Sequence, residues 1–328
     1  MVKIMISIIV PVYKVEKFIE KCATSLFCQT YSNIEYLFVD DATPDKSIVI
    51  LKEVIKRFPD RQDKVRILTH KENKGLPAAR NTGLCAAGGD YIFHCDSDDF
   101  LEPDAMEKLY EKAKENDADI VWCDWFLSFE KNERYMKQPE YDTVIEALKG
   151  LLCDTMKYNV WNKLVKRSIY VDNRIFFPSG HDMGEDMTMI KLFACADKVA
   201  YVPKACYHYK RINTDAFTRS FSDKNLHDII FNTEQTVSFL EKKYGNLLKS
   251  EISYFKLNVK FPLLINDNYR LYRLWKELFS ESDEYIGKNK NLSCRHRMLE
   301  YAASRGWFGI VWLHYNFVYK FIYGILYR

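Results

Sequence analysis

Up to about residue 123, continuously apolar segments alternate with segments whose apolar positions recur every three or four residues. A short apolar run is typical of a strand buried on both faces, and the second spacing is typical of a helix. The predicted strands cover 4–12, 34–39, 65–68, 91–95 and 119–123, and the helices between them cover 16–28, 47–58, 76–87 and 103–114. This alternation predicts right-handed crossovers and an α/β fold, a Rossmann-like and mostly parallel sheet with helices on both faces.

The pattern changes in the second half of the chain. Residues 131–178 show no assignable period, 187–194 form an apolar helical stretch, and 199–211 are typical of a final strand or hairpin. From Asn225 onward helical spacing continues, with breaks, to the end. We therefore predict an α/β domain over residues 1–222 and a helical C-terminal region over 223–328.

Composition is that of an ordinary globular chain large enough for two domains, with 328 residues, 48% apolar and 28% charged. Nine cysteines are scattered without a Cys-x-x-Cys pair, which favours a reducing cytosol. The apolar start is interpreted as the first strand and not as a signal peptide, because no small-residue cleavage site follows a long apolar core.

Charge and aromatic residues concentrate near the C-terminus. From Asn225 to the end there are 15 Lys and Arg against 10 Asp and Glu, which favours an anionic partner or surface. Residues 307–327 hold nine aromatic side chains and one full charge, and three arginines lie just upstream. We predict a cytoplasmic protein that docks peripherally on the inner face of the cell membrane through residues 305–328. A buried C-terminal helix, a dimer contact and a membrane span are the alternatives.

Polar clusters follow several predicted strands, and the carboxyl ends of parallel strands are where such sheets bind ligands. Tyr13 follows the first strand, Asp40-Asp41 the second, and Asp96-Ser97-Asp98-Asp99 a later one. Three carboxylates in four positions need a counter-charge, and a divalent cation with oxygen ligands supplies it. The alternative is a solvated acidic turn before the helix that begins near Pro103.

Three further segments carry candidate chemistry. Gly75 to Gly83 combines a glycine turn, a helix start and Arg80, a combination that suits a diphosphate. Glu185-Asp186 could supply a general base or could simply favour the start of a helix. Trp161 with Lys163, and His208 with Arg211, are aromatic–basic clusters that could bind sugar and phosphate, although core packing would explain the aromatic residues equally well.

In this order the motifs resemble the family 2 glycosyltransferases, inverting nucleotide-sugar-dependent enzymes with a GT-A fold. The resemblance covers roughly residues 4–220. It rests on Val10-Pro11-Val12-Tyr13-Lys14, Val39-Asp40-Asp41, Gly75 to Gly83, Asp96-Ser97-Asp98-Asp99 and Gly184-Glu185-Asp186. The family's Asp-Asp-Gly-Ser is Asp40-Asp41-Ala42-Thr43 here, a change that we expect to be tolerated. The Gln-x-x-Arg-Trp motif of processive synthases is absent, which implies addition of one sugar at a time.

The resemblance also implies a role for each residue. Pro11, Tyr13, Glu16, Asp41, Arg80, Asp96 and Arg211 would bind the nucleotide sugar, a UDP-sugar as first choice. Asp96 and Asp98, with Asp99 as a further candidate, would hold Mn²⁺ or Mg²⁺. Asp186, with Glu185 as the second choice, would be the catalytic base. Trp161, Lys163 and His208 would approach the acceptor or a phosphate. By analogy the acceptor is a glycan, in particular a lipid-linked glycan of cell-surface polysaccharide synthesis.

Two other function classes compete with this interpretation. A sugar nucleotidylyltransferase should carry a Gly-rich loop with Arg and Lys after its first strand, which Pro11-Val12-Tyr13-Lys14 is not. A non-catalytic membrane-associated protein that binds nucleotide sugars would not need the acidic residues. No pattern in the sequence favours nucleic acid as a partner.

Overall fold

The computed structural model describes residues 4–210 and 222–322. Two compact units make up the chain: Met1–Leu148 with Lys157–Thr236, and Lys149–Met156 with Val237–Arg328. The chain therefore passes from one unit to the other after Leu148, after Met156 and after Thr236, and the last change lies inside helix α9 (Asp223–Tyr244). The sequence prediction places the domain boundary at 222/223.

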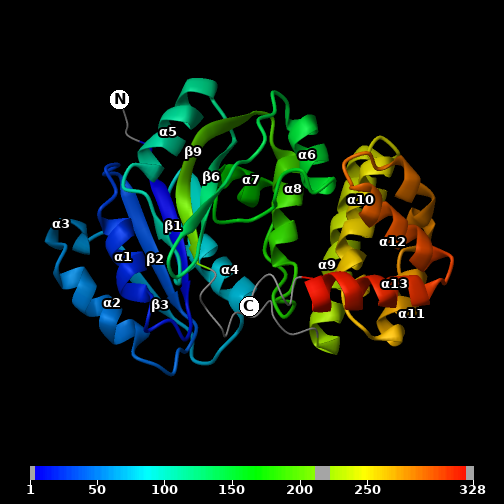
Figure 1. Cartoon of the computed structure of the whole chain (residues 1–328). Coiled ribbons are helices and arrows are strands. Elements are labelled where there is room, and N and C mark those ends of the chain that lie inside the picture. The colour runs from blue at the N-terminus through cyan, green and yellow to red at the C-terminus, as the bar shows by residue number, and fades with distance from the viewer. Residues whose placement is uncertain (1–3, 211–221, 323–328) are drawn as a thin grey trace. The chain divides into compact units, whose positions relative to one another are not determined.

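The first half of the sheet matches the predicted strand–helix alternation. Its strands are β1 (Ile6–Val12), β2 (Ile34–Asp40), β3 (Val65–Thr69) and β4 (Tyr91–His94), all parallel, in the order β3-β2-β1-β4. The helices between and after them are α1 (Ile19–Phe27), α2 (Ser47–Lys56), α3 (Pro59–Gln62), α4 (Leu76–Ala86) and α5 (Ala105–Asn116). Figure 1 shows α1 and α2 side by side along the blue strands. β1 is buried along its whole length, as its apolar sequence requires.

The second half of the sheet is mixed. It contains β5 (Phe100–Leu101), β6 (Ile120–Ser128), β7 (Glu133–Met136), β8 (Lys163–Lys166) and β9 (Val199–Lys210), and the full order is β3-β2-β1-β4-β8-β6-β9-β5, with β7 on β6. β8 runs antiparallel to both β4 and β6, and only β6–β9 is parallel here. The α/β class is confirmed, but the sheet is less parallel than the alternation indicates.

Strand register brings the polar ends of the first strands to one edge. Val12 lies opposite Asp40, Pro11 opposite Val39, and Ile9 opposite His94. The carboxyl ends of β1, β2 and β4 therefore lie close together at one edge of the sheet. Helix α4 packs against β1 at Gly83, where any Cβ would come within 2.4 Å of Ile9 Cγ2. Only glycine permits this approach, which places the N-terminal turns of α4 at the same edge.

Between the sheet strands lie α6 (Val144–Leu152), α7 (Arg167–Asp172), the 3₁₀ turn η1 (Glu185–Met187) and α8 (Thr188–Cys195). The apolar stretch predicted over 187–194 is α8, and all but two of its side chains are buried.

The second unit is helical, as predicted for the C-terminal region. Its elements after α9 are α10 (Lys249–Lys260), η3 (Phe261–Leu264), α11 (Tyr269–Glu277), η4 (Ser280–Lys288), α12 (Cys294–Ser304), α13 (Phe308–His314) and η5 (Tyr315–Ile322). Its core includes Tyr272 and Trp275, and buried Lys260 pairs with Asp283 at 2.7 Å. Across residues 4–210 and 222–322, no helix combines the length and apolar character that crossing a bilayer requires.

Candidate active site

The loops that follow β1 and β2 are tied to each other by side-chain acceptors. Thr43 Oγ1 accepts a hydrogen bond from the Lys14 amide at 2.8 Å, and Asp45 Oδ2 accepts one from the Glu16 amide at 3.0 Å. Tyr13, in the same loop, is 40% exposed. The predicted nucleotide residues Tyr13 and Glu16 therefore lie on a loop with a fixed backbone and solvent-facing side chains.

Asp41 is buried and organises the loop before α4. Its carboxylate accepts hydrogen bonds from the backbone amides of Lys74 (2.8 Å) and Gly75 (2.9 Å), and His70 Nδ1 lies 2.7 Å from Oδ1. The other ring nitrogen of His70 lies 2.8 Å from Thr82 Oγ1 in α4. Asp41 thus shapes the turn from which α4 starts, and its contact with a base stays a prediction.

Ala42 has a φ of 54°, in the left-handed region that favours glycine. This is the position at which the family's Asp-Asp-Gly-Ser motif has its glycine. The alanine therefore adopts a strained backbone conformation at the carboxyl end of β2, and its tolerance stays a prediction.

The acidic turn after β4 divides its carboxylates between two environments. Asp99 is buried, and its oxygens accept hydrogen bonds from the Tyr207 hydroxyl (2.7 Å) and the Lys210 amide (2.7 Å). Burial, with the charges of Asp98 and Asp96, raises the pKa of Asp99 well above its usual value. Asp96 and Asp98 are only partly buried. Asp96 and Asp98 are therefore partly accessible to solvent, whereas Asp99 joins the turn to β9.

Arg80 brings the acidic turn and the Glu185–Asp186 pair into one cluster. Its guanidinium is 1% exposed, and Nη2 lies 3.1 Å from Asp96 Oδ1 and 4.0 Å from Glu185 Oε1. Burial lowers the pKa of Arg80, but the charges of Asp96, Asp186 and Glu185 more than offset this, so the group stays charged. Arg80 Nε and Nη1 have no hydrogen-bond partner among the described residues. Two nitrogens of a buried cation, with three N–H groups between them, thus remain to be satisfied.

The pKa values of both residues of the acid pair are raised. Burial raises the pKa of Asp186 to about 6, with Arg80 opposing the shift, and burial together with Asp186 raises the pKa of Glu185 well above its usual value. Asp186 Oδ1 is buried and accepts no hydrogen bond from the described part of the chain. A carboxylate with such a pKa and an unpartnered oxygen is suited to taking a proton.

Lys163 and Trp161 lie in the interior beside this cluster. Lys163 Nζ donates to Lys157 O (2.7 Å), Asn159 O (2.8 Å) and Asn162 Oδ1 (2.8 Å), so its three N–H bonds hold its own loop. Burial lowers the pKa of Lys163 to about 7, and Asp186 opposes this. Trp161 stacks between the rings of Tyr207 and Tyr209, at 4.5 and 5.3 Å between centroids. Both side chains have packing roles, and contact with an acceptor or phosphate stays a prediction.

His208 has a different setting, on β9. Its ring nitrogens lie 2.8 Å from Glu133 Oε1 and 2.7 Å from Glu102 Oε1, and its ring stacks on Phe100 and Phe126. No described interaction links it to Asp96, Glu185 or Asp186. Arg211 lies outside the described residues.

Sequence reasoning missed two supports of the site. Tyr207 accepts a hydrogen bond from the Asp96 amide (3.1 Å) while donating to Asp99. Asn81, next to Arg80 in α4, exchanges two hydrogen bonds of 2.8 Å with the backbone of Phe177. The position of Asn81 inside the Ala-Arg-Asn-x-Gly segment was the only available signal for it.

Comparison with known proteins identifies the family of this chain. The chain matches the model of the family described as Glycosyl transferase family 2 over residues 7–184, more than half of its length. The match includes the segments with Asp41, Arg80 and Asp96, and it ends one residue before Glu185.

Two curated relatives carry glycosyltransferase names. Glycosyltransferase GlyA of Streptococcus pneumoniae is 32% identical over 79% of this chain, and the uncharacterized glycosyltransferase EpsJ of Bacillus subtilis is 34% identical over 63%. The chain spans only 38% and 61% of the lengths of these two relatives.

Solved structures share the fold. S. aureus TarS 1-349 has a TM-score of 0.70 at 17% identity, with 95% of this chain and 91% of that chain covered, and a complex of it with UDP-GlcNAc scores 0.62 with 92% of each covered. The mannosyltransferase PcManGT of Pyrobaculum calidifontis, in complex with GDP-Man and Mn²⁺, scores 0.52 at 14% identity, with 94% and 84% covered. The family match over more than half of its length shows that this chain belongs to Glycosyl transferase family 2.

Proposed function

We propose that this site transfers one sugar, with inversion, from a nucleoside diphosphate sugar to an acceptor hydroxyl, with Asp186 as the base and a UDP-sugar as the first-choice donor. The observation that carries the proposal is the cluster around Arg80, in which one buried cation faces Asp96, Glu185 and Asp186. A related fold holds UDP-GlcNAc in TarS and GDP-Man in PcManGT, which supports a nucleotide sugar as the donor class.

In the proposed step the acceptor oxygen forms a bond to the anomeric carbon as the bond from that carbon to the diphosphate oxygen breaks. The acceptor proton passes to the Asp186 carboxylate, whose unpartnered Oδ1 is available for it. The bonding electron pair leaves with the diphosphate, and the unfilled N–H groups of Arg80 can stabilise that charge.

A divalent cation fits the acids of this cluster. Asp96 and Asp98 are partly exposed carboxylates, and Arg80 is the one cation within hydrogen-bond distance of Asp96 among the described residues. Oxygen donors of this kind suit Mn²⁺ or Mg²⁺, and PcManGT was solved with Mn²⁺. When bound, the ion would neutralise diphosphate charge. Asp96 and Asp98 would hold it, because Asp99 already serves Tyr207 and the Lys210 amide.

The test is a panel of UDP-, GDP- and dTDP-sugars, incubated with the full chain and Mn²⁺, with release of free nucleoside diphosphate measured with and without glycan acceptors. We expect release from one nucleotide class, and D186N to lose it while still binding the nucleotide. Pyrophosphate-linked nucleotidyl exchange, or no turnover of any donor, would refute the proposal.

We also propose that the C-terminal segment docks on an anionic membrane, which would present a lipid-linked glycan as the acceptor. Seven of the large apolar side chains that are at least 40% exposed lie between Met298 and Phe317: Met298, Tyr301, Trp307, Ile310, Trp312, Leu313 and Phe317. Arg295 and Arg305 are exposed in the same stretch. Aromatic and basic side chains together suit the membrane interface.

Flotation with phosphatidylglycerol vesicles tests docking. The double substitution Trp312→Ser and Leu313→Ser should release the full chain from the vesicles, whereas Leu247→Ser, which removes an equally exposed leucine (65%) elsewhere, should not. Equal flotation of all three proteins, or no flotation of the unmodified chain, would refute docking.

A further inference from the structure

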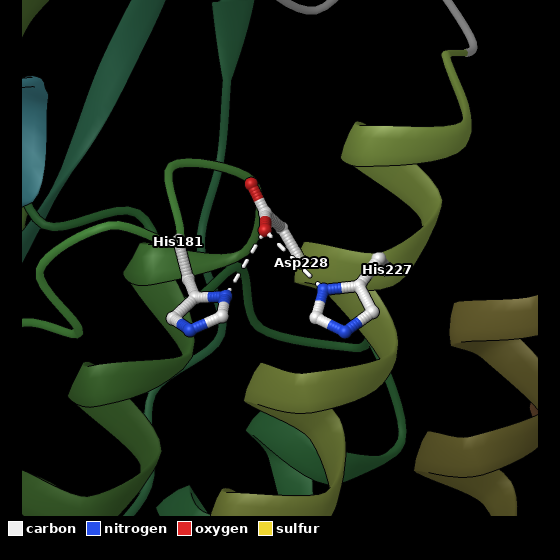
Figure 2. Close-up of side chains that lie close together, drawn as sticks. All are labelled: His181, His227 and Asp228. Carbon is white, nitrogen blue, oxygen red and sulfur yellow. Dashed lines mark hydrogen bonds and ion pairs between the residues drawn. The ribbon is translucent and has the colours of Figure 1, made fainter.

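The loop that leads into Glu185 carries a histidine that faces two potential metal ligands on helix α9. Figure 2 shows the rings of His181 and His227 on either side of the Asp228 carboxylate. His181 Nδ1 lies 3.0 Å and His227 Nδ1 3.8 Å from Asp228 Oδ1, and one ligand atom from each residue lies within 4.8 Å of the others. All three residues belong to the first compact unit.

We propose that His181, His227 and Asp228 form a second metal site, for Zn²⁺ or a related borderline transition-metal ion. Two imidazoles and one carboxylate are the ligands that such ions prefer, whereas Mg²⁺ and Mn²⁺ prefer oxygen. Ligand atoms around a tetrahedral ion of this kind are separated by roughly 3.3 Å, given metal–ligand distances of about 2.0–2.1 Å. The two observed separations of 3.0 and 3.8 Å differ from that value by amounts that small side-chain rotations supply.

Two of the three ligands are already held in position. The Asp182 amide donates to Asp228 Oδ2 at 3.2 Å, which fixes the carboxylate and leaves Oδ1 toward the imidazoles. The His181 ring stacks on Phe231 at 3.8 Å between centroids, with 13° between the planes. Asp228 is 2% exposed at its side chain, and His227 is 73% exposed. The first two therefore supply the fixed part of the site, and His227 can rotate to complete it.

Metal binding here would act on the active-site loop. Asn232 of α9 already donates to Met183 O at 2.7 Å, immediately before Gly184 and the acid pair. A metal that joins His181 to His227 and Asp228 would add a stronger link to the hydrogen bonds that already hold this loop to α9. An effect of this link on catalysis rests on the proposed function. Binding of the metal does not depend on it.

Cobalt is the probe, because tetrahedral Co²⁺ has visible absorption that Zn²⁺ abolishes on displacement. The full chain, freed of metal with a chelator, should bind one equivalent of Co²⁺ with this absorption. H227N should weaken binding at least tenfold. Glu234→Gln, which removes an exposed carboxylate from the same helix, should leave it unchanged. D98A should retain the cobalt signal, which separates this site from the proposed donor site.

Hydrogen exchange supplies the second readout. Zn²⁺ should slow exchange of the backbone amides of residues 181–187 in the unmodified chain and in E234Q, but not in H227N. Absent or unsaturable cobalt binding, equal affinity in H227N, or loss of the signal in D98A would overturn the proposal. A catalytically inactive protein that still binds Co²⁺ through His227 would refute the proposed function and leave this inference standing.

Discussion

The side chains of Arg80 and Asp96 form an ion pair between helix α4 and the turn after β4. The 3.1 Å contact between Arg80 Nη2 and Asp96 Oδ1 joins helix α4 to the carboxyl end of β4, and the same nitrogen lies 4.0 Å from Glu185 Oε1. A buried cation among several carboxylates lowers their pKa values against the effect of burial. Arg80 is therefore the common counter-charge on which the protonation of the acid pair depends.

Arg80→Met should move the pH dependence of sugar transfer. Without the guanidinium, only Lys163 opposes the effect of burial on Asp186, so the pKa of Asp186 should rise by about one unit or more. The acidic limb of the rate profile should therefore shift toward higher pH. Arg80→Lys keeps a positive charge and should shift it less. Arg66→Met, at a surface arginine that donates to Ala86 O, is the control. A pH profile that stays the same in R80M would show that Arg80 has a structural role alone.

The unmodified enzyme should lose activity as the pH falls through about 6. Burial raises the pKa of Asp186 to that value, and the protonated form cannot accept the acceptor's proton. Below the midpoint the rate should fall about tenfold per pH unit for a single essential base. The measurement is kcat from pH 5 to 8 at saturating donor and acceptor. A rate that is flat down to pH 5 would contradict the assignment of the base.

Asp186→Asn should stabilise the fold while it abolishes transfer. A pKa above the unfolded value means that the native state binds the proton more tightly, so this carboxyl favours folding below pH 4 and the advantage is lost as pH rises through 6. An amide is never charged, and it should raise the free energy of unfolding by about 2 kcal/mol at pH 8. Transfer should fall about a thousandfold.

Thermal denaturation at pH 8 and pH 4 measures how the effect of D186N on stability depends on pH. The gain from D186N should be present at pH 8 and small at pH 4, where Asp186 in the native protein is already protonated. Equal effects at both pH values would show that the carboxylate is not the source of the change.

The sequence predicted the first half of the sheet well because its strands are mostly apolar segments that alternate with segments of helical spacing. It missed β8, which has four residues and begins with a lysine, and β7, whose residues are mostly exposed. Both owe their pairing to β6 and not to their own pattern. Hydrophobic periodicity does not predict strands whose formation depends on tertiary contacts.

The candidate site also has features that the sequence predicted and features that it did not. The acidic residues and Arg80 were predicted because motif spacing and strand ends point to them. The sequence did not predict that Asp99 differs in its role from Asp96 and Asp98. That difference depends on Tyr207, a residue more than a hundred positions away. The three acceptors that hold Lys163 come from a loop without any regular pattern.

Substitution by alanine should affect ligand binding at Asp98 and protein stability at Asp99. Asp98→Ala should weaken Mn²⁺-dependent UDP binding at least tenfold. Asp99→Ala leaves the Tyr207 hydroxyl and the Lys210 amide without their buried acceptor, which should cost about 2–4 kcal/mol of stability. Calorimetry with UDP, with and without Mn²⁺, and thermal denaturation measure the two effects. Strong destabilisation by D98A with metal-dependent binding intact would reverse the assignment.

Ala42→Gly should stabilise the protein, although glycine normally does the opposite. At a φ of 54° the methyl group of alanine is strained, by about 1 kcal/mol relative to glycine, and this exceeds the smaller entropic cost of glycine in a loop. Ala78→Gly, in helix α4, is the matched control and should destabilise by about 1 kcal/mol. Chemical denaturation of both variants against the unmodified chain measures the difference. If both lower stability alike, the strain at Ala42 is relieved by its surroundings, and the family's glycine at this position serves ligand approach instead of backbone conformation.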